Sequence, residues 1–141
     1  MLAPKKIVHR KVFNRQGQTK RGMCNRGNKL VFGDFGLMAT STSWITSRQI
    51  EAARRVISRR TKGAKLLIRI FPSRPVTSKG VGIPMGAGVG SIDHFMFPVK
   101  PGRIMFEIKG STKEKILEAF RIAGHKLPVS VRIIDKVTEL L

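Results

Sequence analysis

The stretch Thr46 to Arg60, TSRQIEAARRVISRR, decides the fold, because it is the clearest helix of the chain. Thr46 with Gln49 three residues later forms a capping box, and no Gly or Pro follows before Gly63. At about 100° per residue, the apolar residues of this helix fall on one side and most of its cations fall opposite. The apolar residues are Ile50, Ala53 and Ile57, and the opposite cations are Arg48, Arg55, Arg59 and Lys62, with Arg54 and Arg60 at the flanks. One face is therefore predicted to build a core, and the other to face phosphate.

Short apolar runs surround this helix and predict strands. They cover 30–39, 65–71, a run beginning at Pro75, 92–97, 103–108 and 129–137. A second helix is expected after Gly110, with Ser111 and Glu114 as its capping box and Pro128 as its stop. Its apolar residues are Ile116, Phe120, Ala123 and Leu127. The order β-α-β-β-β-β-α-β predicts an α+β fold, with a mixed or antiparallel sheet and two helices on one side.

The chain divides into an arm and one domain. Residues 1–28 contain three glycines and show no sustained period of 2 or 3.6, so they are predicted to be an extended basic arm that a partner orders. Residues 29–141 are predicted to form a single α+β domain, in which 80–90 is a glycine-rich loop.

Charge gives the strongest indication of a partner. The chain has 28 Lys and Arg against 8 Asp and Glu, a net charge of +20, and 18 of the basic but only 2 of the acidic residues precede Pro75. Such an excess favours nucleic acid, since arginine matches phosphate oxygens and each neutralised phosphate releases counterions. A membrane is disfavoured, because no apolar run approaches a spanning length and the basic N-terminus lacks an apolar face. The single Cys24 excludes an intrachain disulfide, and no secretory signal is visible after Met1.

Several motifs invite an enzymatic interpretation and do not support one. The loop from Gly86 to Gly90 lacks the Gly-Lys-Ser/Thr of a phosphate loop, and the Asp34-Phe35-Gly36 triplet lacks the rest of a kinase. Asp93-His94 could orient a nucleophile, but no Ser, Thr or Cys stands in a recognisable activated setting. We therefore predict no catalysis, no metal, no cofactor and no small-molecule substrate.

Four aromatic residues could stack on bases. Phe32 and Phe35 are expected to fill the core instead, which leaves Trp44 as the better candidate. The fourth is Phe13.

Six collinear segments carry a resemblance that spans nearly the whole chain. They are Met1-Leu2-x-Pro4-Lys5, Phe32 to Leu37, Ile45 to Arg55, Ile68 to Thr77, Met85-Gly86-x-Gly88-x-Gly90, and Ala119-Phe120 through Lys126-Leu127-Pro128. Together they resemble the family of large-subunit ribosomal protein sixteen. The resemblance implies an α/β-hammerhead-like fold that binds large-subunit rRNA beside the aminoacyl-tRNA site, near the peptidyl transferase centre, among neighbouring ribosomal proteins.

Residue by residue, the charge pattern and the resemblance imply two sites. The rRNA-binding residues would be Lys5, Lys6, Arg10, Lys11, Arg15, Lys20, Arg21, Arg26, Lys29, Arg48, Arg54, Arg55, Arg59, Arg60, Lys62, Arg69, Arg74 and Lys79. The loop near tRNA would be Pro84, Met85, Gly86, Ala87, Gly88, Val89 and Gly90.

The loop departs from the family pattern. Bacterial members typically read Arg-Met-Gly-Lys-Gly-Lys-Gly there, so this chain lacks three cations at Pro84, Ala87 and Val89. The segment from Ser91 to Phe95 is more similar to mitochondrial relatives, which favours a mitochondrial ribosome over a bacterial one. Two other readings remain open: a free regulatory nucleic-acid-binding protein, and an enzyme that uses the loop on a nucleotide.

Overall fold

The structure is a computed structural model that describes residues 2–12 and 22–136. Its elements alternate much as the sequence predicts, with one additional strand before the first helix. They are β1 (Phe35–Ala39), β2 (Ser43–Thr46), α1 (Ser47–Arg60), β3 (Lys65–Ile68), β4 (Arg74–Ser78), β5 (Ser91–Val99), β6 (Ile104–Lys109), α2 (Lys113–Gly124) and β7 (Val131–Asp135).

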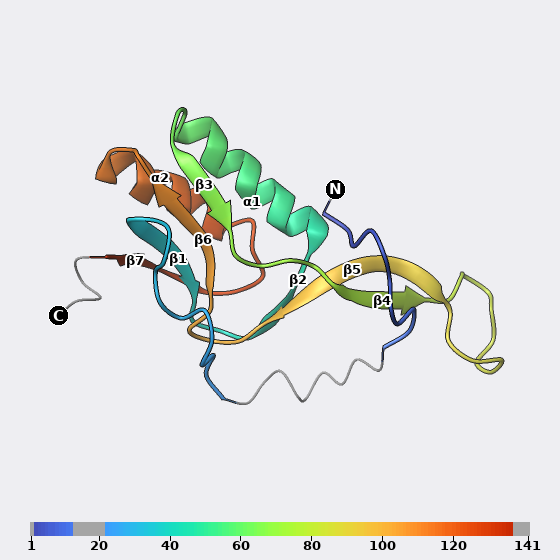
Figure 1. Cartoon of the computed structure of the whole chain (residues 1–141). Coiled ribbons are helices and arrows are strands. Elements are labelled where there is room, and N and C mark those ends of the chain that lie inside the picture. Colours follow the sequence, from blue (N-terminus) through green and yellow to red (C-terminus); the bar gives the residue numbers. More distant parts are fainter. Residues whose placement is uncertain (1, 13–21, 137–141) are drawn as a thin grey trace.

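The strands form two sheets rather than one. A four-stranded sheet has the order β3-β6-β1-β7, and a three-stranded sheet has the order β2-β5-β4; every neighbouring pair is antiparallel. Both helices lie together on one face of the four-stranded sheet, while β4 and β5 extend away from it as a long hairpin (Figure 1). The predicted α+β class, with two helices on one side, is confirmed.

The first helix forms as predicted. The Thr46 hydroxyl accepts from the Gln49 amide, and the Gln49 side chain accepts from the Thr46 amide at 2.9 Å. Ile50, Ala53 and Ile57 are fully buried against the sheet and α2. The periodicity therefore identified the core face of α1 correctly.

The second helix differs at its start. Its N-cap is Thr112, which makes no side-chain capping bond, so the predicted capping box of Ser111 and Glu114 is wrong. The helix begins one residue later than that box requires, and Glu114 lies in the first turn, where a carboxylate still favours the helix dipole. The predicted apolar face is correct, since Ile116, Phe120 and Ala123 are buried.

The first predicted strand was too long. Only Phe35–Ala39 pairs as β1, because the amides of Phe32 and Gly33 donate to the carboxylate of Glu107 instead of to a neighbouring strand. The strand β2 was missed, since its four residues immediately precede the helix cap.

The strand predicted at 92–97 was too short, since β5 continues to Val99. Pro98 and Val99 still pair with β2, and the chain reverses at 100–103, where Gly102 has a φ of +87°.

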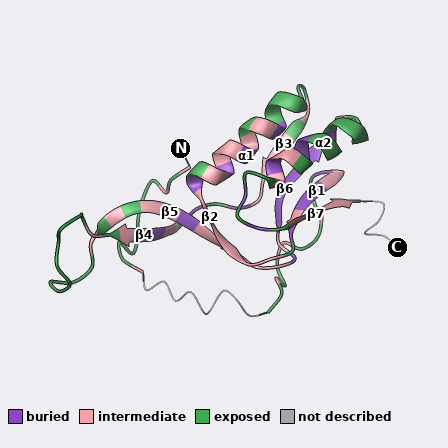
Figure 2. Ribbon diagram, turned by 180° about the vertical axis from the view of Figure 1, so that it is seen from behind, coloured by how far each residue is buried: buried purple, intermediate pink, exposed green. Residues whose placement is uncertain are grey.

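The core lies between the four-stranded sheet and the two helices. Leu37, Phe106 and Phe120 are completely buried there together with Ile57 of α1. The loop between β4 and β5 is exposed along almost its whole length (Figure 2). The fold thus has a rigid body at one end and a projecting hairpin at the other.

Candidate nucleic-acid interface

Three cations of the α1 segment are exposed and have no carboxylate partner among the described residues. They are Arg48 in the first turn, Arg59 in the last turn, and Lys62 just beyond the helix. Because like charges on one surface repel each other, such a group favours a bound polyanion that neutralises it. These three residues are the unpaired part of the predicted phosphate face.

The other arginines of α1 are held by acids. Glu51 binds Arg54 at 2.8 Å and Arg55 at 2.9 Å. The hydrogen bonds from Arg54, and then those from Arg55, lower the pKa of Glu51 to about 2, so this carboxylate stays ionised near neutral pH. Arg60 pairs with Glu118, which places its side chain against α2. Part of the predicted phosphate face is therefore engaged within the protein.

The N-terminal segment adds further exposed cations. It runs beside the β4-β5 hairpin, and the Nζ of Lys11 donates to the carbonyl of Val89 at 2.8 Å (Figure 1). Lys5, Lys6 and Arg10 are exposed along this segment. The predicted contacts Arg15, Lys20 and Arg21, and also Phe13, lie outside the described residues.

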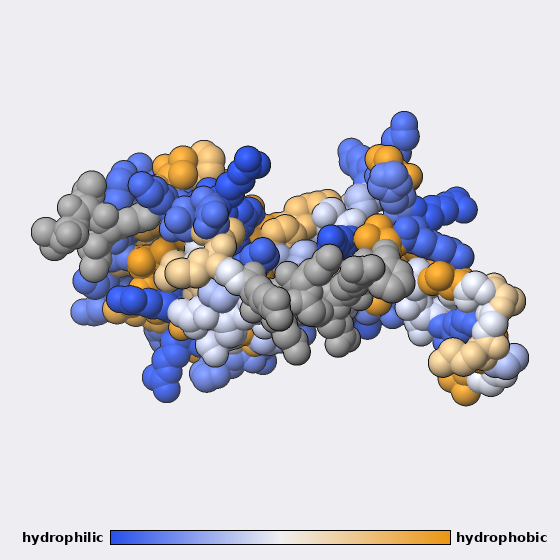
Figure 3. Space-filling view, turned by 90° about the horizontal axis from the view of Figure 1, so that it is seen from below, coloured by the Kyte–Doolittle hydropathy of each residue, from blue (hydrophilic) through white to orange (hydrophobic). Residues whose placement is uncertain are grey.

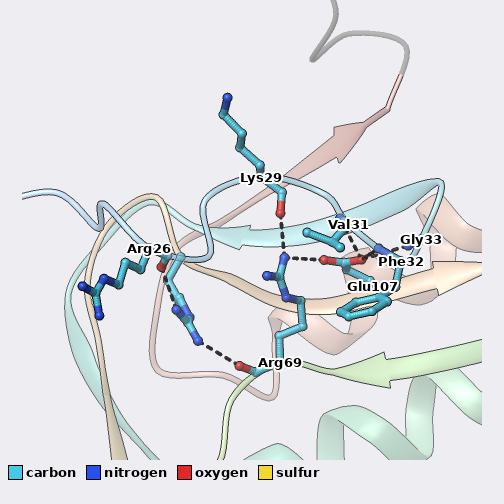
Figure 4. A network of polar contacts seen from close by, with 8 residues as sticks. Arg26, Lys29, Val31, Phe32, Gly33, Arg69 and Glu107 are labelled. Carbon is cyan, nitrogen blue, oxygen red and sulfur yellow. Dashed lines mark hydrogen bonds and ion pairs between the residues drawn. The ribbon is translucent and has the colours of Figure 1, made fainter.

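Near the end of the predicted arm, the chain is joined to the sheet. The Cys24 amide donates to the carbonyl of Pro101 at 2.8 Å, and the Ile104 amide donates to that of Gly27 at 3.0 Å. Arg26 and Lys29 are exposed here, and their side chains point away from the polar network beneath them (Figure 4).

That network is centred on Glu107 of β6, which is completely buried. Its carboxylate accepts from the amides of Phe32 at 2.7 Å and Gly33 at 2.8 Å, and it pairs with Arg69 (Figure 4). Burial by itself raises the pKa of Glu107, but the two amides and Arg69 together outweigh it, and the net shift is downward. Arg69, a predicted rRNA contact, thus has a side chain only 17% exposed that is engaged inside the fold.

A second arginine ties this region together and was not singled out from the sequence. Arg103 donates to the carbonyls of Arg26 at 2.6 Å and Arg69 at 3.0 Å, and lies over the ring of Phe97 at 5.7 Å. Its Nε is buried without a hydrogen-bond partner. Arg103 therefore connects the N-terminal segment to the sheet through its hydrogen bonds.

The loop between β4 and β5 has no cation at its tip, but two lysines outside the tip bind its carbonyls. Lys79 donates to Gly86 at 2.5 Å, and Lys11 reaches Val89. Val81 and Met85 are almost wholly exposed, and Figure 3 shows the loop as a projecting lobe of mixed and apolar colour at the right of the molecule. The other predicted contact on this hairpin, Arg74, is half-buried in β4.

Asp93 and His94 lie beside the start of α1. The Nδ1 of His94 is 2.7 Å from the Asp93 carboxylate, and the pair borders a hollow of about 260 Å³ with Thr46, Ser47 and Arg48. Sequence reasoning did not anticipate that Ser47 would border the same hollow as the Asp93-His94 pair. Among the described residues, however, no hydrogen bond joins Ser47 to His94, so the arrangement of an activated nucleophile is not formed there.

The aromatic expectations need one correction. Phe32 does not fill the core: its side chain is 58% exposed, because its amide is held at the surface by Glu107. Phe35 packs against the core as expected, and Trp44 is half-buried in β2.

Within residues 2–12 and 22–136, no three His, Cys, Asp or Glu are grouped to hold a metal ion. No helix in the same residues has the length and hydropathy needed to cross a membrane.

The fold and its surface define a basic α+β protein whose unpaired cations suit a polyanion. The sequence model of "Ribosomal protein L16p/L10e" matches residues 4–134. The large ribosomal subunit proteins uL16 of Streptococcus uberis and Streptococcus suis are each 46% identical to this chain over 140 residues, which is 99% of the chain and the full length of each relative. The chain belongs to the ribosomal protein L16p/L10e family, whose members are structural constituents of the large ribosomal subunit.

Proposed function

We propose that the protein anchors itself in the large ribosomal subunit by binding rRNA phosphates with its unpaired cations. The observation that carries this proposal is the division of the α1 cations. Arg54, Arg55 and Arg60 have acidic partners, whereas Arg48, Arg59 and Lys62 are exposed and have none among the described residues. A solvated helix face normally mixes both signs of charge, so a uniformly positive set favours phosphate.

The N-terminal segment supplies the second part of this surface. Lys5, Lys6 and Arg10 are exposed on an extended segment, which can follow the nucleic-acid backbone over a longer path than a helix face. The predicted contacts at Arg15, Lys20 and Arg21 belong to the same proposal. Arg69 has a different role in it, because it is held by Glu107 and positions the neighbouring segment.

We further propose that the loop from Pro84 to Gly90 lies near aminoacyl-site tRNA. Support comes from the family resemblance and from the position of the loop at the far end of the β4-β5 hairpin (Figure 1). The Nζ atoms of Lys11 and Lys79 donate to its carbonyls. These two lysines place positive charge beside a tip that contains no cation. The loop would therefore approach tRNA mainly through its backbone and its apolar side chains.

No catalytic role is part of this proposal, and neighbouring ribosomal proteins are expected partners. The protein is a ribosomal one. Both curated relatives are bacterial, and they give no support to the mitochondrial preference drawn from Ser91 to Phe95.

A charge-matched comparison tests the rRNA proposal. The triple variant Arg48→Ala, Arg59→Ala, Lys62→Ala should bind large-subunit rRNA fragments much more weakly than the unmodified chain. A control variant removes three exposed lysines of the C-terminal half, Lys109, Lys115 and Lys126, and changes the net charge equally. Equal losses in both variants would show that only total charge matters and would contradict a defined α1 interface.

A further inference from the structure

Phe32 is exposed on a segment that the fold holds rigidly. Phe32 is 58% exposed, and its neighbour Val31 is 62% exposed. The amides of both residues, with that of Gly33, donate to the buried Glu107 carboxylate at 3.4, 2.7 and 2.8 Å in chain order. An exposed phenylalanine on a mobile loop would lose backbone conformational freedom when it bound a partner, but the backbone of Phe32 is already held by these bonds.

Close packing beneath the segment adds to this rigidity. A Cβ at Gly33 would come within 2.8 Å of the backbone nitrogen and oxygen of Ile108, so the segment lies directly on β6. Its position therefore cannot shift away from the sheet without breaking the bonds to Glu107. Burying a carboxylate is energetically costly, and here that carboxylate holds a surface segment in position. This indicates that the position of the segment is important for function.

The chemistry around the ring matches a nucleotide. The guanidinium of Arg69 lies over the ring, 5.9 Å from its centroid, and Arg69 is paired with Glu107. Lys29 is exposed on the segment that leads to Phe32 and its side chain points outward, whereas Arg26 lies on the other side of the network and points away from the ring (Figure 4). Residues 22–33 contain no acid. A nucleotide has a planar base that can stack on the exposed ring and a phosphate that can pair with the neighbouring positive charge. An acidic peptide would use only the positive charge, and an apolar peptide would use only the ring.

We propose that Phe32 is a stacking site for one unpaired base of rRNA, with Lys29 contacting a flanking phosphate. This inference rests on the proposed function, because it assumes that the protein binds rRNA and adds that the segment around Phe32 contacts an unpaired base. It assigns the role that sequence reasoning gave to Trp44 to a residue expected in the core. In single-stranded RNA recognition, an aromatic side chain holds a splayed base in this way.

The test uses two probes of equal length and charge, a short oligoadenylate and the same backbone without bases. Phe32→Ala should weaken binding to the oligoadenylate by roughly 5- to 150-fold, the range for one base–aromatic stack, and should leave binding to the abasic probe unchanged. Phe32→Trp should keep the affinity, and Phe32→Leu should lose most of it, because leucine is apolar but has no ring. Phe71→Ala removes another exposed ring, one that is 44% exposed, and serves as the control.

The outcomes separate the two proposals. An equal loss on both probes would mean that Phe32 acts through the fold or through charge, and would overturn the stacking site. Unchanged binding to both probes would mean that the ring contacts no base and would also overturn it. If the unmodified chain binds neither these probes nor large-subunit rRNA, the proposed function itself fails.

Discussion

Replacing Glu107 by Gln should destabilise the protein far more than its small chemical change suggests. One carboxylate oxygen accepts from the amides of Phe32 and Gly33, and the other accepts from Arg69. Glutamine has a single acceptor oxygen, so its amide group must face either the two backbone donors or the guanidinium. Removing one partner of a buried ion pair costs about 3–5 kcal/mol. For a chain of this size, that loss corresponds to a fall in melting temperature of roughly 10–20 °C.

Thermal unfolding followed by circular dichroism measures the effect, with Glu118→Gln as the control. Glu118 also joins two elements through an arginine, but its side chain is 59% exposed, so its loss should cost about 0–1 kcal/mol. If Glu107→Gln and Glu118→Gln shift the melting temperature equally, the network does not hold the segment before β1.

The pH dependence gives an independent check. The pKa of Glu107 in the folded protein is below its ordinary value of 4.5, so its stabilisation is complete above that value and is lost as pH falls through the folded pKa. The difference in stability between the unmodified chain and Glu107→Gln should therefore shrink at acidic pH. A difference that stays constant down to strongly acidic pH would show that the carboxylate charge is not involved.

The remaining predictions concern the interface and the core. Ile57→Ala should destabilise the fold by about 2–5 kcal/mol, because its side chain is fully buried, and should leave rRNA affinity intact in the folded protein. Arg59→Ala should weaken rRNA binding and leave the stability of the fold unchanged. A melting temperature that falls for Arg59→Ala but not for Ile57→Ala would show that the two faces of α1 are assigned wrongly. If about 6 to 10 phosphates are bound, affinity for rRNA should fall by roughly 10³ to 10⁵ between about 50 and 200 mM salt in a filter-binding titration, and a flat dependence would exclude phosphate anchoring. In free protein, hydrogen exchange should leave the amides of Lys5 to Lys11 unprotected and protect that of Cys24, which is bonded to Pro101; protection of the first group would show that the N-terminal segment folds without RNA.

The sequence predicted the parts of the fold in which local pattern and tertiary structure agree. The capping box at Thr46 and the spacing of Ile50, Ala53 and Ile57 gave α1 its start and its core face. The errors occur where a residue distant in the sequence determines the local structure. Residues 30–34 have the composition of a strand, but a carboxylate more than 70 positions away takes the amides of Phe32 and Gly33.

The site was predicted only as a set of charges. Composition shows that cations outnumber acids, but it cannot show which cations the few acids hold, and Arg60 is paired by Glu118 from another helix. The buried ion pair of Glu107 could have been predicted from the sequence, although it was not. Glu107 is a lone carboxylate in the apolar run from Ile104 to Ile108, and a buried charge requires a partner.

Co-sedimentation with ribosomal particles tests the central claim most directly. The full chain, tagged and expressed in a bacterial host, should travel with large subunits through a sucrose gradient at moderate salt. The variant lacking Arg48, Arg59 and Lys62 should move toward the top of the gradient, while the control lacking Lys109, Lys115 and Lys126 should stay with the subunits. If the unmodified chain remains at the top of the gradient, or if the α1 variant sediments with the subunits as the unmodified chain does, anchoring through the unpaired cations of α1 is contradicted.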